Sequence, residues 1–397
     1  MKIILISNVM PTPDNYRAGS AHPYHLIKYR PDDVEIEAYI FNSNGVRQDR
    51  IDHIANDLNI SIKVLKGAKW FDWMFKLHLS FLKNFLPYPF GCYYPVLSKN
   101  IINEINIKKA DGIWFWGDTM IRISKLFPQY QRVLTLPDSV ALYYHRLMGD
   151  HFLFGSFYRM VGNCIQYYKN IKMEREYTSD NNIHYHLVGE ADRQYLNLIN
   201  PQIQTHFIRH PHYNIKHNKT IRFSQPKIKI LLAGQYNLYM KTAFDSILPA
   251  LCEHKELALH YSITFLGKGW DFAVEKLKAA GYESERLGFV DVYVDEIIKY
   301  DIQLTPISVG TGTKGKVLDA LANGLLAIGT PYAMENIAVE NGKSCIVYST
   351  AKELVNYLND IFQNVSGYEQ MAENGRKAIL EDHDRATVSK QLFDLFK

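Results

Sequence analysis

Short hydrophobic runs typical of β-strands alternate with longer helical patterns along this chain, and the alternation occurs in two series. The first series has such runs at residues 2–7, 34–40, 61–65, 112–116, 132–136 and 183–188. The second series has them at residues 227–233, 261–267, 301–307, 325–330 and 345–348. Strands separated by helices form parallel sheets with crossover helices. We therefore predict an α/β fold with two Rossmann-like, doubly wound domains that face each other across a cleft.

A polar, basic stretch at residues 214–226 separates the two series and has the composition of a linker. The length of 397 residues fits two domains, since one domain usually has about 100–200 residues. We predict an N-terminal domain at 1–215 and a C-terminal domain at 216–383. The tail at 384–397 has the pattern of an amphipathic helix, which we expect to pack back on the N-terminal domain.

The composition excludes several classes of protein. The net charge of +4 is too small for this length to indicate nucleic-acid binding. The four cysteines lie far apart and form no CxxC pair, which argues against a disulfide scaffold. No run of about 18 apolar residues is present, so no transmembrane helix is predicted. We expect a cytoplasmic protein.

Residues 70–86 (WFDWMFKLHLSFLKNFL) are predicted to form one amphipathic helix that ends before Pro87. Lysines lie just upstream of this segment, and Asp72 is the only acidic residue from 61 to 83. A basic amphipathic helix with tryptophans is able to lie on an anionic membrane surface. The alternative is a helix that faces the core of the N-terminal domain. The first interpretation makes the protein peripheral on the inner face of the membrane.

The run at 306–324 (PISVGTGTKGKVLDALANG) is predicted to be a loop followed by a helix. Thr313 is the predicted N-cap, and Gly324 suits the position just after the helix. The glycines let the backbone approach a ligand closely, and a helix start with exposed N–H groups attracts anions. Lys316 adds a positive charge in the first turn, and Asp319 one turn later is able to accept hydrogen bonds from hydroxyls. The simplest ligand has a phosphate near Lys316 and a sugar near Asp319.

Two standard nucleotide motifs match this run only in part. Gly310, Gly312 and Gly315 fit the dinucleotide fingerprint GxGxxG, but the run lies late in its domain and no acidic residue ends the next strand. The spacing from Gly310 to Lys316 also fits a P-loop, but Val317 stands where a Ser or Thr should hold Mg²⁺. Neither motif explains the whole pattern.

The run resembles the donor site of retaining GT-B glycosyltransferases, specifically glycosyltransferase family 4. The matching residues are Pro306, Gly310, Gly312, Lys316, Asp319, Ala320, Ala322, Gly324 and Thr330. The resemblance extends to residues 267–269 (GKG), which match the family's strand-end glycine pair, and to 288–290 (GFV), which match its base-contacting loop. Residues 19–20 (GS) are similar to the glycine-rich loop that follows the family's first strand.

This sequence departs from the family pattern at several positions. The family's two glutamates, eight positions apart, fall on Thr311 and Asp319, so the first carboxylate is missing and the second is shortened. The usual Gly-Arg with a following Lys is replaced by Gly234-Gln235 with Lys241. A bacterial variant, GxGTxxK, is closer to the run found here. We expect donor binding to be kept and donor choice to be unusual.

The resemblance implies an enzyme that transfers a sugar from a nucleotide-sugar to an acceptor hydroxyl, with retention and without a metal or other cofactor. It implies a glycan or lipid-linked acceptor and a role in glycan or polysaccharide assembly. The residues expected to bind the donor are Gly19, Gln235, Lys241, Lys268, Val290, Thr311, Gly312, Thr313, Lys316 and Asp319.

Two residues of the N-terminal half are the candidates for catalysis. Asp118 follows the strand 112–116, where family members often have a histidine or an acid near the sugar; the alternative is that it caps the next helix. His22 lies beside the 19–20 loop and is the predicted general base if the enzyme inverts.

Two other functions stay open from the sequence. A nucleotide-sugar epimerase shares this architecture and needs no acceptor, so product analysis without acceptor distinguishes it. The missing glutamate at Thr311 also fits a relative that binds sugar nucleotides without catalysis.

Overall fold

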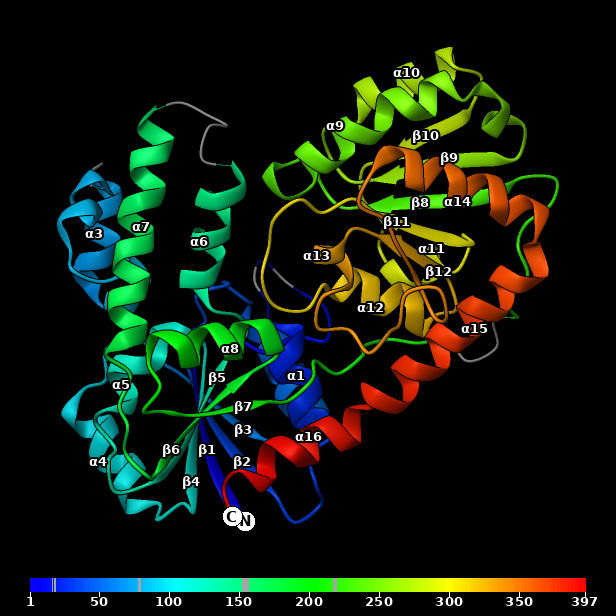
Figure 1. Cartoon of the computed structure of the whole chain (residues 1–397). Coiled ribbons are helices and arrows are strands. Elements are labelled where there is room, and N and C mark those ends of the chain that lie inside the picture. The colour runs from blue at the N-terminus through cyan, green and yellow to red at the C-terminus, as the bar shows by residue number, and fades with distance from the viewer. Residues whose placement is uncertain (16, 18, 78–79, 152–156, 217–219) are drawn as a thin grey trace. The chain divides into compact units, whose positions relative to one another are not determined.

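The computed structural model describes residues 1–15, 17, 19–77, 80–151, 157–216 and 220–397. Contacts divide the chain into two units (Figure 1): unit 1 is Met1–Pro211 with Arg385–Lys397, and unit 2 is His212–Asp384. The predicted boundaries, after residues 215 and 383, lie within a few residues of these.

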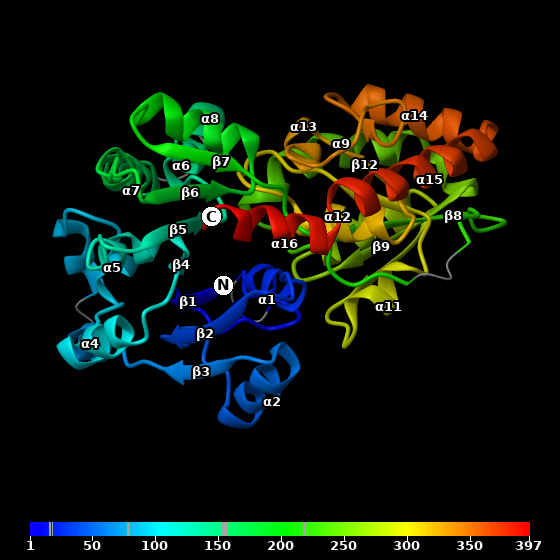
Figure 2. The same cartoon turned by 90° about the horizontal axis from the view of Figure 1, so that it is seen from below.

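Unit 1 is built on one parallel sheet with the strand order β3-β2-β1-β4-β5-β6-β7, which Figure 2 shows side by side. The strands are β1 (Lys2–Ser7), β2 (Glu35–Ile40), β3 (Ser61–Val64), β4 (Gly112–Trp116), β5 (Gln131–Leu136), β6 (Ile183–Leu187) and β7 (Gln204–Phe207). The central strands β1 and β4 are buried along nearly their whole length and read as almost continuous apolar runs. Strand β7 was not predicted, because at the sheet edge it is only partly buried and its sequence, QTHF, is mostly polar.

The helices of unit 1 are α1 (Ala21–Lys28), α2 (Gln48–Leu58), α3 (Lys69–Lys76), α4 (Lys99–Ile107), α5 (Ile121–Ser124), α6 (Val140–His151), α7 (Phe157–Arg175), α8 (Glu190–Ile199) and α16 (Arg385–Asp394). Three 3₁₀ turns join them: η1 (Ser80–Phe85), η2 (Phe90–Tyr93) and η3 (Asp118–Met120). Helix α16 packs within unit 1, since the Ser389 hydroxyl donates to the Leu26 carbonyl at 2.7 Å and the Phe393 ring meets Trp114 at 5.8 Å.

The prediction of one helix over residues 70–86 is wrong. Helix α3 ends at Lys76, and the 3₁₀ turn η1 covers residues 80–85; residues 78–79 lie outside the described part. The inner side of α3 is held by Phe71, whose ring stacks on Phe90 at 4.1 Å. Trp70 and Trp73 are exposed, so much of the aromatic content of this segment does not serve the core.

Unit 2 has a second parallel sheet, with the order β10-β9-β8-β11-β12-β13. Its strands are β8 (Ile228–Ala233), β9 (Tyr261–Leu266), β10 (Glu283–Leu287), β11 (Ile302–Thr305), β12 (Leu326–Gly329) and β13 (Ile346–Val347). Strand β10 was also not predicted, because this edge strand reads ESERL and is exposed along most of its length.

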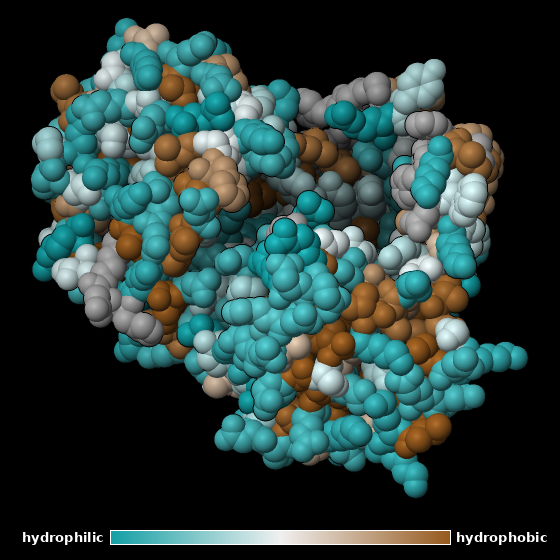
Figure 3. Space-filling model, turned by 180° about the vertical axis from the view of Figure 1, so that it is seen from behind, coloured by the Kyte–Doolittle hydropathy of each residue, from teal (hydrophilic) through white to brown (hydrophobic). Residues whose placement is uncertain are grey.

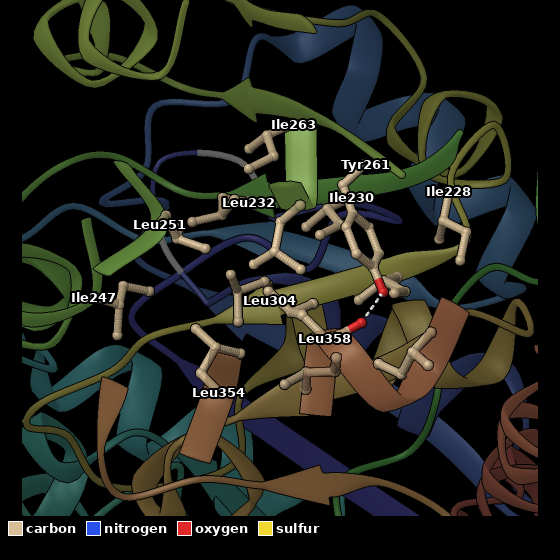
Figure 4. Packing of buried hydrophobic residues seen from close by; sticks show 14 of the residues in the cluster. Ile228, Ile230, Leu232, Ile247, Leu251, Tyr261, Ile263, Leu304, Leu354 and Leu358 are labelled. Atoms are coloured by element: carbon tan, nitrogen blue, oxygen red, sulfur yellow. Dashed lines mark hydrogen bonds between the residues drawn. The ribbon is translucent and has the colours of Figure 1, made fainter. Parts of the chain in front are cut away.

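The helices of unit 2 are α9 (Leu238–Glu253), α10 (Asp271–Ala279), α11 (Tyr293–Ile297), α12 (Gly315–Ala322), α13 (Pro331–Met334), α14 (Ala351–Gln363) and α15 (Val365–Asp382), with the 3₁₀ turn η4 (Lys255–Leu259). Figure 4 shows side chains of β8, β9 and β11 packed against α9 and α14. The Tyr261 hydroxyl donates to the Leu358 carbonyl at 2.6 Å inside this core, which satisfies its only polar group.

Both sheets are doubly wound, and each has one point at which the order of the strands reverses. In unit 1 the reversal lies between β1 and β4, and in unit 2 between β8 and β11. Ligands of such sheets bind outside the carboxyl ends of the strands at this switch point. Ligand sites are therefore expected at the loops after β1 and β4 in unit 1 and at the loops after β8 and β11 in unit 2.

Among the described residues, no helix is both long enough and apolar enough to cross a membrane.

Candidate functional site

The loops that follow β8 and β9 touch through their backbones at the carboxyl edge of the unit 2 sheet. Gly267 has φ +146°, and a Cβ atom there would lie 2.1 Å from the Gly234 carbonyl oxygen. The Trp270 indole donates to that same oxygen at 2.8 Å, and the Tyr236 amide donates to the Lys268 carbonyl at 3.0 Å. Only glycine allows this approach, so the sequence GKG holds a rigid backbone surface beside the switch point.

The loop 306–314, which follows β11, is held by side-chain hydrogen bonds. The Thr330 hydroxyl accepts from the Ile307 amide at 3.2 Å and donates to the Ile307 carbonyl at 2.6 Å. The Lys314 ammonium donates to the carbonyls of Thr311 and Gly312 at 2.9 and 3.0 Å. Gly312 has φ +62°, which favours glycine. The Lys314 ammonium therefore compensates the negative ends of these carbonyl dipoles. The loop is then suited to an anion.

Helix α12 starts directly after this loop. The predicted N-cap, Thr313, is wrong by one residue, because the N-cap is Lys314, with no side-chain cap. Lys316 lies in the first turn as predicted, and Gly324 follows the helix with φ +79°. The residues on the inner side of the helix are fully buried, which fixes its start at the sheet edge; they are Val317, Leu318, Leu321 and Ala322.

Lys316, Asp319 and Tyr293 form a small polar group on α12 and α11. The Lys316 ammonium lies 5.3 Å from the centre of the Tyr293 ring. Burial of the ammonium lowers the pKa of Lys316, and the Asp319 carboxylate partly opposes that shift. Burial, followed by the Asp319 charge, raises the pKa of Tyr293. The Tyr293 hydroxyl is buried and has no hydrogen-bond partner among the described residues, so this group has a donor left for a ligand.

The other predicted donor residues of unit 2 lie on neighbouring loops. Gln235 and Lys268 are exposed after β8 and β9. Val290, after β10, packs partly buried against the cluster that contains Leu231 and Leu325. Lys241 on α9 contacts the Tyr236 hydroxyl at 3.1 Å and Asp245 at 3.3 Å. Its charge is thus partly engaged on the surface.

His22 lies at the switch point of unit 1. The Trp116 indole at the end of β4 donates to His22 Nδ1 at 3.3 Å, and a Cβ atom on Gly19 would lie 3.9 Å from the Trp116 ring. Because Nδ1 accepts, the neutral ring carries its hydrogen on Nε2. Burial, then His210 and His186, hold the pKa of His22 well below its usual range. The buried Nε2 has no partner among the described residues, and it is a donor, whereas a general base would need an acceptor there.

A chain of hydrogen bonds fixes the neighbouring histidine, His186. The Trp114 indole donates to Thr135 Oγ1 at 2.8 Å, and that hydroxyl lies 3.1 Å from His186 Nδ1. His186 Nε2 lies 3.1 Å from the Ile208 carbonyl, to which it donates. Burial lowers the pKa of His186 to about 4. The ring is therefore neutral near pH 7, and this group of buried residues is ordered but uncharged.

Asp118 begins the 3₁₀ turn η3, and its Oδ1 accepts from the Thr119 amide at 2.8 Å. This contact reaches only the next residue and is not a helix cap, since the N-cap of η3 is Gly117 and no side chain caps that turn. Burial raises the pKa of Asp118. The predictions for its catalytic role and for the other site residues stay predictions.

Two carboxylates that the sequence did not indicate hold the start of α6. Glu174 accepts from the Ser139 hydroxyl at 2.8 Å and the Ala141 amide at 3.0 Å, while Asp192 accepts from the Ser139 amide at 2.9 Å. Burial raises the pKa of Glu174 to about 8, although both hydrogen bonds oppose the rise. Their positions on α7 and α8 give no sequence signal, because each acid lies within a helical pattern near another acid, Glu176 or Glu190.

No group of three or more metal-ligating side chains is found among the described residues. His184 and His206 on β6 and β7 pair with each other at 2.9 Å.

Known proteins resemble this chain in sequence over only part of its length. No protein-family model matches it. A protein of Klebsiella pneumoniae, described as an uncharacterized 44.6 kDa protein in the cps region, is 24% identical over 187 residues, or 43% of this chain and 47% of that protein. The match thus spans about half the length of this relative.

Several solved structures are similar over nearly the full length. The UDP complex of Anabaena Alr3699/HepE has a TM-score of 0.64 at 11% identity and covers 99% of each chain. Sucrose-phosphate synthase from Thermosynechococcus elongatus has a TM-score of 0.65 at 11% identity, and a glycosyltransferase from Rickettsia africae has 0.64 at 11%; each covers 100% of this chain and 98% of its own. With its two parallel-sheet units, this chain has the GT-B fold of glycosyltransferases.

Proposed function

We propose that this protein is a glycosyltransferase that moves a sugar from a nucleotide-sugar donor to an acceptor hydroxyl. The observation that carries the proposal is the loop 306–314 leading into α12 at the unit 2 switch point, with Lys316 in the first turn. HepE, which has the same fold, is solved with UDP and with UDP-glucose. That ligand class fits a helix start with a nearby cation.

Charge stabilisation is the chemical role of the unit 2 residues in this proposal. When the bond between the anomeric carbon and the diphosphate breaks, negative charge grows on the leaving diphosphate. Lys316 and the start of α12 would stabilise that charge, so we propose transfer without a metal. Asp319 would accept hydrogen bonds from the ribose hydroxyls, and the loop at Val290 would hold the base.

We further propose that the sugar keeps its anomeric configuration. The new bond then forms between the anomeric carbon and the acceptor oxygen on the face from which the diphosphate leaves, and the acceptor proton passes to the departing phosphate oxygen. In unit 1, His22 would donate its Nε2 hydrogen to a sugar or acceptor oxygen. This role follows from its tautomer; the general base predicted for an inverting reaction stays a prediction.

The acceptor in this proposal is a glycan or a lipid-linked glycan, in glycan or polysaccharide assembly on the cytoplasmic side. The four cysteines are free thiols, which fits a reducing compartment.

A second candidate is a relative that binds sugar nucleotides without transferring the sugar. Thr311 supplies no carboxylate, and its carbonyl is bound by Lys314. This candidate keeps the donor site and lacks one of the groups expected beside the sugar.

A donor panel followed by a transfer assay tests both candidates. Thermal shift with UDP-, GDP-, TDP- and CMP-sugars identifies the donor, and nucleotide release is then measured with and without glycan acceptors. Acceptor-dependent release with a new glycoside supports transfer. Donor binding without release across the acceptor panel favours the second candidate, and no stabilisation by any sugar nucleotide overturns the proposal.

A further inference from the structure

Exposed hydrophobic side chains gather on two segments of unit 1. Figure 3 shows hydrophobic residues reaching the surface in patches among hydrophilic ones. Among the described residues, nineteen large hydrophobic side chains are exposed, and ten of them lie on α3, η1 and α7 or directly beside them. They are Trp70, Trp73, Leu77, Phe81, Leu82, Phe85, Phe157, Tyr158, Val161 and Tyr168. Such a concentration on a small part of the chain indicates an interaction surface.

The side chains of α3 face in two directions. Phe71 points inward, stacking on Phe90 at 4.1 Å and meeting Tyr94 at 5.1 Å. Trp70, Trp73 and Leu77 follow at helical spacing on the outer side, and Trp73 is 61% exposed. The packed inner side fixes the helix, so the outer tryptophans remain exposed in a folded element.

Contacts join η1 to α7. The Lys169 ammonium of α7 donates to the Lys83 carbonyl of η1 at 2.6 Å. Just beyond η1, Tyr88 donates to Glu176, and the Lys172 ammonium lies 5.3 Å from the Tyr88 ring centre. Figure 1 shows α3 and α7 side by side at one end of unit 1. The two segments therefore form one continuous surface, on which Phe85 is 81% and Tyr158 is 87% exposed.

Positive charge surrounds these aromatic residues. Residues 66–87 contain four lysines (Lys66, Lys69, Lys76 and Lys83) and one acid, Asp72. Residues 151–173 contain no acid, and Arg159 lies directly beside Tyr158. The four lysines and Arg159 are all exposed. A binding partner of this surface should therefore be both apolar and anionic.

We propose that this aromatic–lysine surface, made of the ten hydrophobic residues with Lys66, Lys69, Lys76, Lys83 and Arg159, binds an anionic phospholipid bilayer. Tryptophan and phenylalanine enter the boundary between headgroups and acyl chains, while the lysines meet the anionic headgroups. A second copy of the chain fits less well, because lysine is depleted in protein interfaces and two such surfaces would repel each other. The inference concerns where the protein binds and does not depend on the proposed transfer reaction.

Vesicle co-sedimentation of the full chain tests the proposal. The vesicles are pure phosphatidylcholine and an equimolar mixture with phosphatidylglycerol. Each is tested at about 0.1 M and about 0.5 M NaCl, and the higher salt shortens the screening length about twofold. We expect binding to the anionic vesicles only, weaker at high salt. The double variants Trp73→Ala with Phe85→Ala and Lys76→Glu with Lys83→Glu should each reduce binding at least tenfold.

Matched variants and a donor-binding measurement complete the design. Leu198→Ala with Leu259→Ala removes exposed leucines elsewhere, and Lys278→Glu with Lys352→Glu makes the same charge change elsewhere; both should bind vesicles like the parent. Binding to neither vesicle, equal binding to both, or equal losses in the matched variants overturns the proposal. The proposal is also overturned if sedimentation velocity shows that the parent chain forms an oligomer and that only the surface variants dissociate it. Donor stabilisation measured on the same variants should not change, which separates this result from any failure of the proposed function.

Discussion

The two switch points of this chain share a topology and differ in chemistry. In unit 2 the strand reversal between β8 and β11 is occupied by a glycine-containing loop and the cationic side chain of Lys316, an exposed residue. In unit 1 the reversal between β1 and β4 is occupied by His22 and Trp116, both buried. The same parallel framework thus presents a charged surface in one unit and a fixed, uncharged hydrogen-bond donor in the other.

This difference predicts how each region recognises a ligand. An exposed ammonium acts through its charge, which salt screens. A buried neutral imidazole acts through the direction of one N–H group, which salt hardly affects. Substitutions in the two regions should therefore give different kinds of loss.

The largest expected effect comes from Lys316→Ala. Removing the cation from the start of α12 should lower transfer, or donor affinity where no transfer is found, by roughly 100-fold. The loss should shrink as salt is raised. The melting temperature should hardly change, because the side chain is exposed. Steady-state kinetics and calorimetric titration check this, with Lys278→Ala as the matched lysine variant; unchanged turnover and affinity would contradict the site.

The next effect concerns His22. His22→Leu removes the Nε2 donor and should lower kcat/KM by roughly tenfold, the value of one hydrogen bond of about 1–1.5 kcal/mol. Its pKa lies well below the usual range, so the wild-type rate should not show the tenfold fall per pH unit of a titrating histidine between pH 6 and 8. A pH profile of kcat/KM that bends in this interval for the wild type and is flat for His22→Leu would show that His22 acts as a general base.

The sequence predicts the framework of both regions better than their side-chain geometry. Central strands such as β1 and β4 are continuous apolar runs, because both faces of a parallel sheet are covered. The edge strands β7 and β10 lack that signal. Local pattern likewise places Lys316 in the first turn of α12, since the helix and its start depend on nearby residues.

Local sequence patterns do not predict the geometry of the unit 1 site, because the residues in contact there are distant in sequence. His22 and Trp116 are 94 positions apart, and only their contact reveals which ring nitrogen carries the hydrogen. The segment 70–86 shows another limit: its periodicity predicts an amphipathic helix but not which face is covered. Phe71 is covered and Trp73 is not.

A third test measures what it costs unit 1 to keep its buried groups uncharged. With a folded pKa of about 4 for His186 against about 6.5 when unfolded, the unfolded state binds more protons below pH 6.5, so stability falls from pH 6.5 towards pH 4. Glu174 has the opposite sign, because its folded pKa of about 8 exceeds its unfolded value, so stability rises as the pH falls from 8 to about 4.5.

Glu174→Gln separates these two contributions. The variant loses the compensating rise, so its unfolding free energy should drop by about 2 kcal/mol more than that of the wild type between pH 7 and pH 5. Urea unfolding at the two pH values measures the difference, with Glu373→Gln on the exposed side of α15 as the control. Equal slopes for Glu174→Gln and wild type would show that this carboxyl is ionised in the folded protein.

The smallest expected effect compares two hydroxyls with corresponding places in the two units. Thr330→Val removes both hydrogen bonds to Ile307 and should cost about 1 kcal/mol of stability, while donor affinity falls a few-fold because the loop 306–314 loses its anchor. Thr135→Val breaks the link from Trp114 to His186 and should cost at least as much stability, since it leaves buried polar groups unpaired, but should not change donor affinity. Urea unfolding measures the stability of both variants, and donor titration measures their affinity. Thr330→Ser, which keeps the hydroxyl, is the control. If both variants weaken donor binding equally, the loss reflects general destabilisation, and the loop 306–314 has no specific role in holding the donor.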